Sequence, residues 1–150
     1  MEDKRELGEL LEMFVNTVSH PRGRVLEFMS EASVTVPQSI LLNFASMIPN
    51  CTPSSLAAKL HISLPSASQM IERLVKLELL ERMEDASDRR RKVVTATAKG
   101  RTFLKRQRAL RIVEYAAGTA LLTETTRLRL TQALKQALSE MVTPTGGTAN

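Results

Sequence analysis

The chain has 150 residues and a formal net charge of +5, with 43% hydrophobic and 25% charged residues. This composition is ordinary for one folded domain and excludes a wholly disordered or fibrous chain. No apolar run approaches the length of about 18 residues that a membrane-spanning helix needs, and the first residues lack a secretory signal, so we expect neither. The single cysteine, Cys51, cannot form an internal disulfide, which fits a protein of the reducing cytoplasm.

The positive charge is concentrated in the middle of the chain. Residues 61–111 carry 13 Lys and Arg against 6 Asp and Glu, whereas residues 1–60 have a net charge of −2 and residues 112–150 are neutral. A basic segment is typical of proteins that bind polyanions, although a solvated charged surface would have the same composition. Aromatic residues make up only 3% of the chain, which provides few stacking partners for single-stranded bases and favours duplex nucleic acid.

The N-terminal third of the chain is predicted to be helical. Apolar residues at helical spacing predict a helix over 3–19, and Pro21 and Gly23 predict a kink or break at His20–Gly23. The apolar stripe resumes in phase after the break, so we expect both segments to share one buried face. The residues of that face are Leu7, Leu10, Leu11, Phe14, Val18, Val25, Leu26 and Met29.

A further helix is predicted over residues 37–48, with Pro37 in its first turn. Its apolar stripe is too wide for a surface helix, so we expect it to lie at the centre of the fold. The residues of that stripe are Ile40, Leu41, Phe44, Met47 and Ile48.

Two short helices with clear start signals follow. Thr52 can cap a helix that has Pro53 in its first turn, and Ser63 can cap a second helix over 64–77. The apolar positions of this second helix that should face inward are Ala67, Ile71 and Leu74. The polar positions that should face outward are Ser66, Ser68, Gln69, Glu72, Arg73 and Lys76. Two capped helices joined by a short turn are typical of a helix-turn-helix.

A basic hairpin is predicted directly after the second helix. Residues 79–83 and 92–97 have the composition of strands, and the segment 84–91 between them is highly charged and contains three consecutive arginines. A hairpin at this place in the order of elements is typical of the wing of a winged helix.

The C-terminal part of the chain is again predicted to be helical. Thr97 can cap a long helix over 98–117, and Thr123 can cap a last helix over 124–141. Residues 143–150 lack an apolar anchor, so we expect a disordered tail. The predicted fold class is therefore mainly α-helical with a small β-hairpin wing.

In the order and spacing of these elements, residues 36–141 resemble the MarR family of winged helix-turn-helix transcription regulators. The resemblance is strongest over 52–100, where the helix-turn-helix is followed by the segments Leu79-Leu80-Glu81-Arg82, Asp88-Arg89-Arg90-Arg91 and Thr97-Ala98-Lys99-Gly100. It implies a single domain over 1–142, with a winged helix-turn-helix lobe over about 36–97 and dimerisation helices over about 3–31 and 98–142.

The resemblance also implies a homodimer that binds a pseudo-palindromic DNA duplex. Each recognition helix enters a major groove, and each wing reaches the adjacent minor groove. Gln69 suits a bidentate contact with adenine, and Arg73 can reach guanine or a phosphate. The residues that the resemblance implies as DNA contacts are Ser54, Ser63, Leu64, Ser66, Ser68, Gln69, Arg73, Arg89, Arg90 and Arg91.

In the wing, Arg90 matches the arginine that enters the minor groove in the family, and Asp88 matches the residue that pairs with a nearby arginine and stiffens the hairpin. Arginine suits a narrow minor groove because negative potential is concentrated there. The alternatives are an exposed salt-bridged loop for the wing tip and plain surface positions for Ser66 and Ser68.

The chain departs from the family pattern at three places. Leu64 and Gln69 stand where many relatives carry polar or basic residues, so we expect a different preferred operator. Glu78 stands where glycine usually ends the recognition helix, and a left-handed backbone is costly for other residues, so we expect a remodelled turn. The segment Pro21-Arg22-Gly23 interrupts the first helix.

Members of the family commonly bind a small aromatic or anionic effector between the dimerisation helices and the DNA-binding lobe. The residues of this chain that could line such a pocket are Met13, His20, Arg22, Phe44 and Met47. The alternative for the Met and Phe residues is an ordinary place in the core.

Other functions have less support in the sequence. No cluster of zinc ligands, glycine-rich phosphate loop or nucleophile motif is present, so we expect no enzyme activity, cofactor or metal. We expect Cys51 to be a small buried residue, with a redox switch as the alternative, and His61 to serve in the turn between two helices rather than contact a phosphate. A winged helix that binds another protein remains the alternative function, and it would not need the wing arginines.

Overall fold

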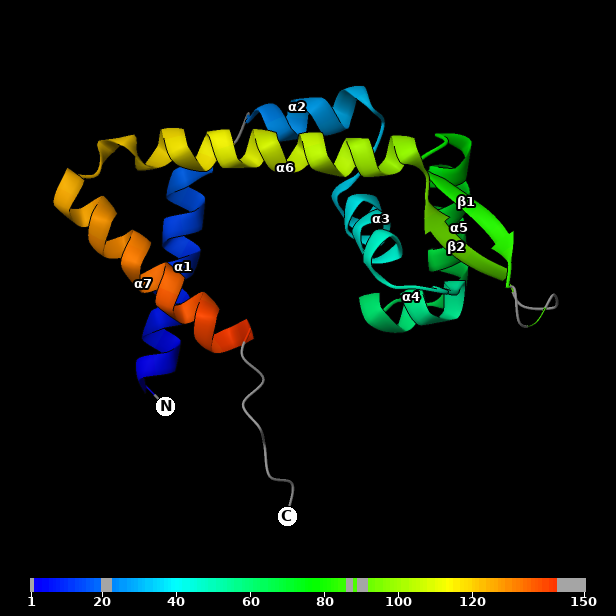
Figure 1. The fold of residues 1–150 in the computed structure, drawn as a ribbon, viewed down its shortest axis with the longest axis horizontal. Helices are drawn as coiled ribbons and strands as arrows, with labels where there is room; N and C mark the ends of the chain where they lie inside the picture. The colour runs from blue at the N-terminus through cyan, green and yellow to red at the C-terminus, as the bar shows by residue number, and fades with distance from the viewer. Residues whose placement is uncertain (1, 20–22, 86–87, 89–91, 143–150) are drawn as a thin grey trace, which may run out of the picture. The chain divides into compact units, whose positions relative to one another are not determined.

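The protein is described by a computed structural model over residues 2–19, 23–85, 88 and 92–142 (Figure 1). These residues form seven α-helices, one short 3-10 helix and one antiparallel two-stranded sheet, which confirms the predicted fold class. The elements are α1 (Glu2–Val18), α2 (Arg24–Glu31), α3 (Val36–Met47), α4 (Pro53–Leu60), α5 (Leu64–Lys76), β1 (Leu80–Glu84), β2 (Lys92–Ala96), α6 (Ala98–Gly118), η1 (Thr119–Leu121) and α7 (Glu124–Val142).

The chain divides into two compact units. The central unit comprises residues 21–113, and the terminal unit comprises residues 1–20 and 114–150. Residues 21–31 and 98–113, which we had placed with the dimerisation helices, pack in the same unit as the helix-turn-helix. The predicted disordered tail, residues 143–150, lies outside the described residues.

The predicted capping residues begin the helices as expected. The hydroxyl of Thr52 accepts a hydrogen bond from the backbone N–H of Ser55 at 3.1 Å, and Ser63 Oγ accepts from the N–H of Ser66 at 3.3 Å. The N-cap of α3 is Thr35, and Gln38 Oε1 accepts a hydrogen bond from the backbone N–H of Thr35 at 2.9 Å. Such a reciprocal pair satisfies two donors that a helix start leaves unpaired.

The core of the central unit lies around α3. Leu41 and Leu42 of this helix are fully buried, and the helix packs against α4, α5 and β2, which confirms its predicted central place. The predicted stripe is nevertheless wrong in part, because Ile40 and Met47 are 44% and 70% exposed. The reason is geometric: neighbouring elements cover only part of the helix surface, and these two residues lie outside that part.

The N-terminal half of α6 is joined to α2 and α3 by specific side-chain contacts. The rings of Phe28 and Phe103 stack with centroids 4.8 Å apart, and the guanidinium of Arg106 lies 5.0 Å from the Phe28 ring centroid. In the interior, Ser39 Oγ donates to Gln107 Oε1 at 2.8 Å. These contacts place the first four turns of α6 firmly within the central unit.

The sheet is a single hairpin in which Leu80 pairs with Ala96 and Glu84 pairs with Lys92 (Figure 1). The ammonium of Lys92 lies 3.0 Å from the Glu84 carboxylate, which adds a cross-strand ion pair at the far end of the hairpin. The N–H of Val94 donates to the carbonyl of Cys51 at 2.7 Å, so β2 is tied to the segment that precedes α4.

In the terminal unit, α1 packs closely against the end of α6. A Cβ on Gly118 would lie 2.6 Å from the Cα of Val18, so only glycine permits this approach. The predicted break between the first two helices is confirmed, since α1 ends at Val18 and α2 begins at Arg24.

The predicted common buried face of these two helices is wrong for most of its length. Val18, Val25 and Met29 are buried. In contrast, the members of the predicted face that are exposed in the single chain are Leu7, Leu10, Leu11 and Leu26. Helical periodicity predicts that such residues are covered but does not say by which element or by which molecule.

Candidate nucleic-acid interface

The helix-turn-helix is formed by α4 and α5. The first helix ends at His61, whose left-handed backbone (φ 52°) turns the chain, and Ser63 then caps α5. The inner side of α5 is anchored in the core, because Ala67, Ile71 and Leu74 are fully buried as predicted. This anchoring holds α5, which we call the recognition helix, in one orientation.

The outer face of the recognition helix carries exposed polar side chains, as predicted. The residues of this face are Ser66, Gln69, Glu72, Arg73 and Lys76, with Ser68 half-buried. Within the described part of the chain, Arg73 and Lys76 form no ion pair, whereas Glu72 lies 3.8 Å from Arg82 of β1. Two cations of the helix are therefore available to a ligand.

Two grooves flank this face. The first is lined by residues at the starts of α4 and α5 and by β2, namely Thr52, Pro53, Ser54, Leu64, Ser68 and Lys92. It brings together three of the predicted DNA contacts, Ser54, Leu64 and Ser68. The sequence prediction missed Lys92, although its place directly after the wing arginines was a signal.

The second groove runs between the start of α3 and the recognition helix. Its lining residues are Gln38, Gln69, Met70, Glu72, Arg73 and Lys76. Gln69 and Arg73 were predicted as contacts, and Lys76 was predicted only to face outward. The sequence prediction missed Gln38 altogether, because nothing in the local pattern distinguishes it from any other capping residue.

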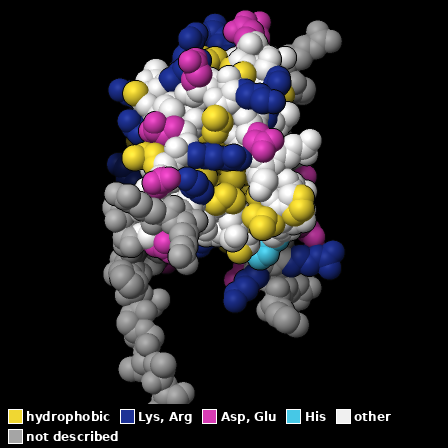
Figure 2. Space-filling model, turned by 90° about the vertical axis from the view of Figure 1, so that its right-hand side faces the viewer, with side chains coloured by type: hydrophobic (Ala, Val, Ile, Leu, Met, Phe, Trp, Pro, Cys, Tyr) yellow, Lys and Arg dark blue, Asp and Glu magenta, His cyan; other side chains and the backbone are white. Residues whose placement is uncertain are grey.

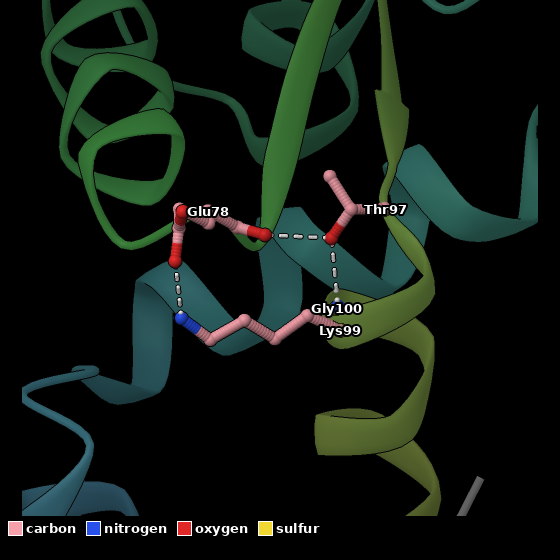
Figure 3. Close-up of polar contacts among 4 residues, drawn as sticks. All are labelled: Glu78, Thr97, Lys99 and Gly100. Carbon is pink, nitrogen blue, oxygen red and sulfur yellow. Dashed lines mark hydrogen bonds and ion pairs between the residues drawn. The ribbon is translucent and has the colours of Figure 1, made fainter.

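The turn after the recognition helix is not remodelled, contrary to our expectation. Glu78 adopts the left-handed conformation (φ 60°) that glycine would adopt there. Figure 3 shows how the turn is held: Thr97 Oγ1 donates to the Glu78 carbonyl at 2.6 Å, and Lys99 Nζ donates to Glu78 Oε2 at 2.9 Å. The hydrogen bond from Lys99 and its positive charge lower the pKa of the Glu78 carboxyl. These contacts offset the cost of a left-handed backbone at a residue other than glycine, which is the cost that led us to expect a remodelled turn.

The start of α6 fits closely against the same turn. Thr97 Oγ1 accepts from the N–H of Gly100 at 3.0 Å and so caps the helix, as predicted (Figure 3). A Cβ on Gly100 would lie 2.1 Å from the carbonyl oxygen of Leu79. These two contacts explain the Thr-x-x-Gly segment. Thr97 caps the first turn of α6, and Gly100 has no side chain that would collide with the Leu79 carbonyl.

The wing tip is described only in part. Asp88 is exposed, and Arg89, Arg90 and Arg91 lie outside the described residues. The expected contacts of these arginines, and the pairing of Asp88 with one of them, therefore stay predictions. On the face of the molecule in Figure 2, basic side chains alternate with acidic and apolar ones, so the described surface is not uniformly positive.

The residues predicted to line an effector pocket are placed as follows. Met13 is exposed on α1 in the terminal unit, Phe44 is half-buried against the core of the central unit, and Met47 is exposed on α3. His20 and Arg22 lie outside the described residues. The effector pocket stays a prediction.

The remaining candidates, Cys51 and His61, are placed as follows. Cys51 is 1% exposed and its Sγ lies 3.4 Å from Ser55 Oγ, as expected for a buried structural thiol. His61 ends α4, and its backbone N–H donates to the carbonyl of Ala58 at 3.2 Å. Among the described residues no group of His, Cys, Asp and Glu could hold a metal ion, and no helix is long and apolar enough to cross a membrane.

Comparison with known proteins agrees with this geometry. Residues 32–91 match the family model described as MarR family. The HTH-type transcriptional regulator YsmB of Bacillus subtilis is 30% identical over 64 residues, which is 43% of this chain and 44% of that relative. The match thus spans less than half the length of YsmB.

Solved structures share the fold over nearly the whole chain. The transcriptional regulator Tm0710 of Thermotoga maritima is 19% identical with a TM-score of 0.74, over 93% of this chain and 94% of that one. The S. aureus MepR–DNA complex is 19% identical with a TM-score of 0.63, over 91% and 96%. MepR has also been solved with ethidium bromide, and that structure has a TM-score of 0.62 at 19% identity, over 89% and 95%.

Proposed function

We propose that this chain is a member of the MarR family of winged helix-turn-helix transcription regulators, whose family model matches residues 32–91, and that it is a homodimer that binds a pseudo-palindromic duplex of specific sequence. We further propose that it acts in the cytoplasm as a repressor, and that a small aromatic or anionic effector releases it from DNA.

The observation that carries the proposal is the outer face of the recognition helix. Three fully buried residues fix the inner side of α5, and the opposite side presents amide, hydroxyl and guanidinium groups to solvent. The major groove of B-DNA is about 12 Å wide and admits one α-helix, and its base edges pair with such groups. A surface that bound another protein through an apolar contact would not need this set of donors.

We assign the base contacts to the first half of the helix. Gln69 can donate to N7 and accept from N6 of adenine, and Ser66 lies one turn earlier on the same exposed face. Leu64 lies beside the start of α4 and can contact a thymine methyl group. In the wing, Arg90 would enter the minor groove, with Arg89 and Arg91 on phosphates.

The terminal unit supports the homodimer. Apolar side chains on α1 and α7 are exposed in the single chain: Leu7, Leu10, Leu11 and Met13 on α1, and Leu128, Leu134, Leu138 and Met141 on α7. Monomeric proteins rarely leave so many large apolar side chains in water on two helices of one unit. A second copy with two-fold symmetry would cover them and would place two recognition helices for two half-sites.

The effector part of the proposal depends on the family and on one relative. MepR has been solved both with DNA and with ethidium bromide. For this chain the candidate lining residues are still those predicted from the sequence. A phenolic acid should raise the melting temperature of the protein and weaken its operator binding, and failure of both effects would count against an effector of this class.

The test of DNA recognition is binding to an operator selected from random duplexes, compared with a scrambled duplex, over a range of salt. A dimer that contacts about 6–10 phosphates should lose about 10³–10⁵ in affinity between roughly 50 and 200 mM salt. Arg90→Ala should weaken binding to both duplexes, and Gln69→Ala should reduce the preference for the operator. If the wild type does not distinguish the two duplexes at moderate salt, the protein-interaction module becomes the better interpretation.

A further inference from the structure

The groove between α3 and the recognition helix contains two polar residues, Gln38 and Lys76, to which the proposed function gives no role. Its polar lining residues come from two helices that are far apart in the sequence: Gln38 from the first turn of α3, and Gln69, Glu72, Arg73 and Lys76 from α5. The groove therefore extends the outer face of the recognition helix to a second element of the central unit.

The side-chain amide of Gln38 is used only in part by the described residues. Its Oε1 accepts from the backbone N–H of Thr35 at 2.9 Å, and the backbone N–H of Gln38 donates to the Thr35 hydroxyl at 3.4 Å. Among the contacts of the described residues, its Nε2 group has no acceptor. The capping pair thus holds the side chain in place and leaves two N–H donors at the groove.

The charges of the groove favour an anion. Arg73 and Lys76 form no ion pair within the described part of the chain, and both are exposed. The one acid of the groove, Glu72, lies 3.8 Å from Arg82, which offsets its charge. Arg73, Lys76 and the Nε2 group of Gln38 together offer only donors, and phosphate oxygens only accept.

We propose that Gln38 of α3, together with Arg73 and Lys76 of α5, binds a backbone phosphate of the DNA beside the recognition helix. This inference rests on the proposed function. It assigns Arg73 to the phosphate rather than to guanine, and it separates the helix into a first half that reads bases and a second half that fixes its position on the duplex. Contacts of this second kind orient a protein but carry no sequence information.

The decisive variant is Gln38→Glu. Glutamate is as good as glutamine at the third position of a capping box and is favourable near a helix N-terminus, so α3 should keep its start and the melting temperature should not fall. The variant replaces the two N–H donors with a negative charge that repels phosphate. We expect affinity for the operator and for the scrambled duplex to fall by the same factor, of at least about tenfold.

Lys76→Ala provides an independent test, with Lys105→Ala as its matched control. Both variants remove one exposed lysine, but Lys105 lies on α6 and does not line the groove. Lys76→Ala should reduce the magnitude of the negative slope of log affinity against log salt by about 1 for each copy of the protein in the complex. Lys105→Ala should leave the slope unchanged.

The possible results separate the two proposals. If the wild type shows no operator preference, the proposed function fails, whatever the variants do. If the wild type is specific but Gln38→Glu binds as tightly as the wild type, the phosphate site is wrong and the function stands. If Gln38→Glu or Lys76→Ala loses operator affinity but keeps its affinity for the scrambled duplex, the groove reads bases, and the assignment to a phosphate is overturned.

Discussion

The carboxylate of Glu78 accepts a hydrogen bond from the ammonium of Lys99 at 2.9 Å, and this contact joins the turn after the recognition helix to the first turn of α6. Glu78 itself has a φ of 60°, a conformation in which a side chain is strained. The same residue is held through its carbonyl by the Thr97 hydroxyl. Glu78, which is disfavoured in a left-handed backbone, is thus held by two residues at the start of α6, Thr97 and Lys99.

Glu78→Gln should make the protein less stable at neutral pH and less sensitive to acid. Lys99 lowers the pKa of Glu78 below its ordinary value of 4.5, so the unfolded state binds this proton more tightly than the folded state. The stability from this group is therefore complete above pH 4.5 and is lost as pH falls through the lower pKa of the folded state. Urea titrations should separate wild type and variant at neutral pH and bring them together in acid.

The control for this prediction is Glu81→Gln. Glu81 is exposed on β1 and has no ion pair among the described residues, so its neutralisation should change stability little. Equal stability of wild type and Glu78→Gln at neutral pH would show that the contact with Lys99 contributes nothing.

Gly100→Ala and Gly8→Ala should change stability in opposite directions. The new Cβ at residue 100 would lie 2.1 Å from the Leu79 carbonyl oxygen, and backbone must move to admit it. We expect a loss of about 1–3 kcal/mol or more in the free energy of unfolding. Gly8 has no atom within 4 Å of its added Cβ, so alanine should gain about 0.5–1 kcal/mol through helix propensity. Thermal or urea unfolding measures both, and a neutral Gly100→Ala would contradict the close approach.

Ser39→Ala should cost about 1–3 kcal/mol, because it leaves the buried Gln107 Oε1 without its donor. The double variant Ser39→Ala with Gln107→Leu should recover much of this loss, since no unpaired oxygen then remains in the interior. Ser46→Ala is the matched control on the same helix: Ser46 is exposed, and its removal should change stability by less than about 0.5 kcal/mol. Purely additive effects of the two buried substitutions in a double-mutant cycle would argue against this coupling.

Leu134→Glu should shift the proposed dimer toward monomer. Leu134 is a large apolar residue of α7 that is 47% exposed in the single chain, and a charge there would have to be buried against the second copy. Gln132→Glu adds the same charge to an exposed polar position of the same helix and should leave the assembly intact. Sedimentation equilibrium distinguishes the two variants. A dimer that survives Leu134→Glu would place the interface elsewhere.

Much of the fold could be predicted because its signals are local. Capping residues such as Thr52 and Ser63 act on N–H groups within three residues of themselves, and the 3.6-residue period places Ile71 and Leu74 on one side of a helix. The order of helix-turn-helix, hairpin and long helix could be read from such signals alone. The exposed leucines of α1 could be identified as an apolar stripe, but whether a helix of the same chain or a second copy covers such a stripe is not a local property.

The sequence by itself determined the helices, their start points, the hairpin, and which side of the recognition helix faces away from the core. Only the tertiary structure decided that Gln38 lies beside Arg73 and Lys76, that Lys99 supports Glu78, and that Gly100 must pass the Leu79 carbonyl. The physical reason is the range of the interactions. Capping and periodicity depend on neighbours along the chain, whereas these contacts join residues about 20 to 40 positions apart, and they exist only once the helices have packed around the buried residues of α3 and α5.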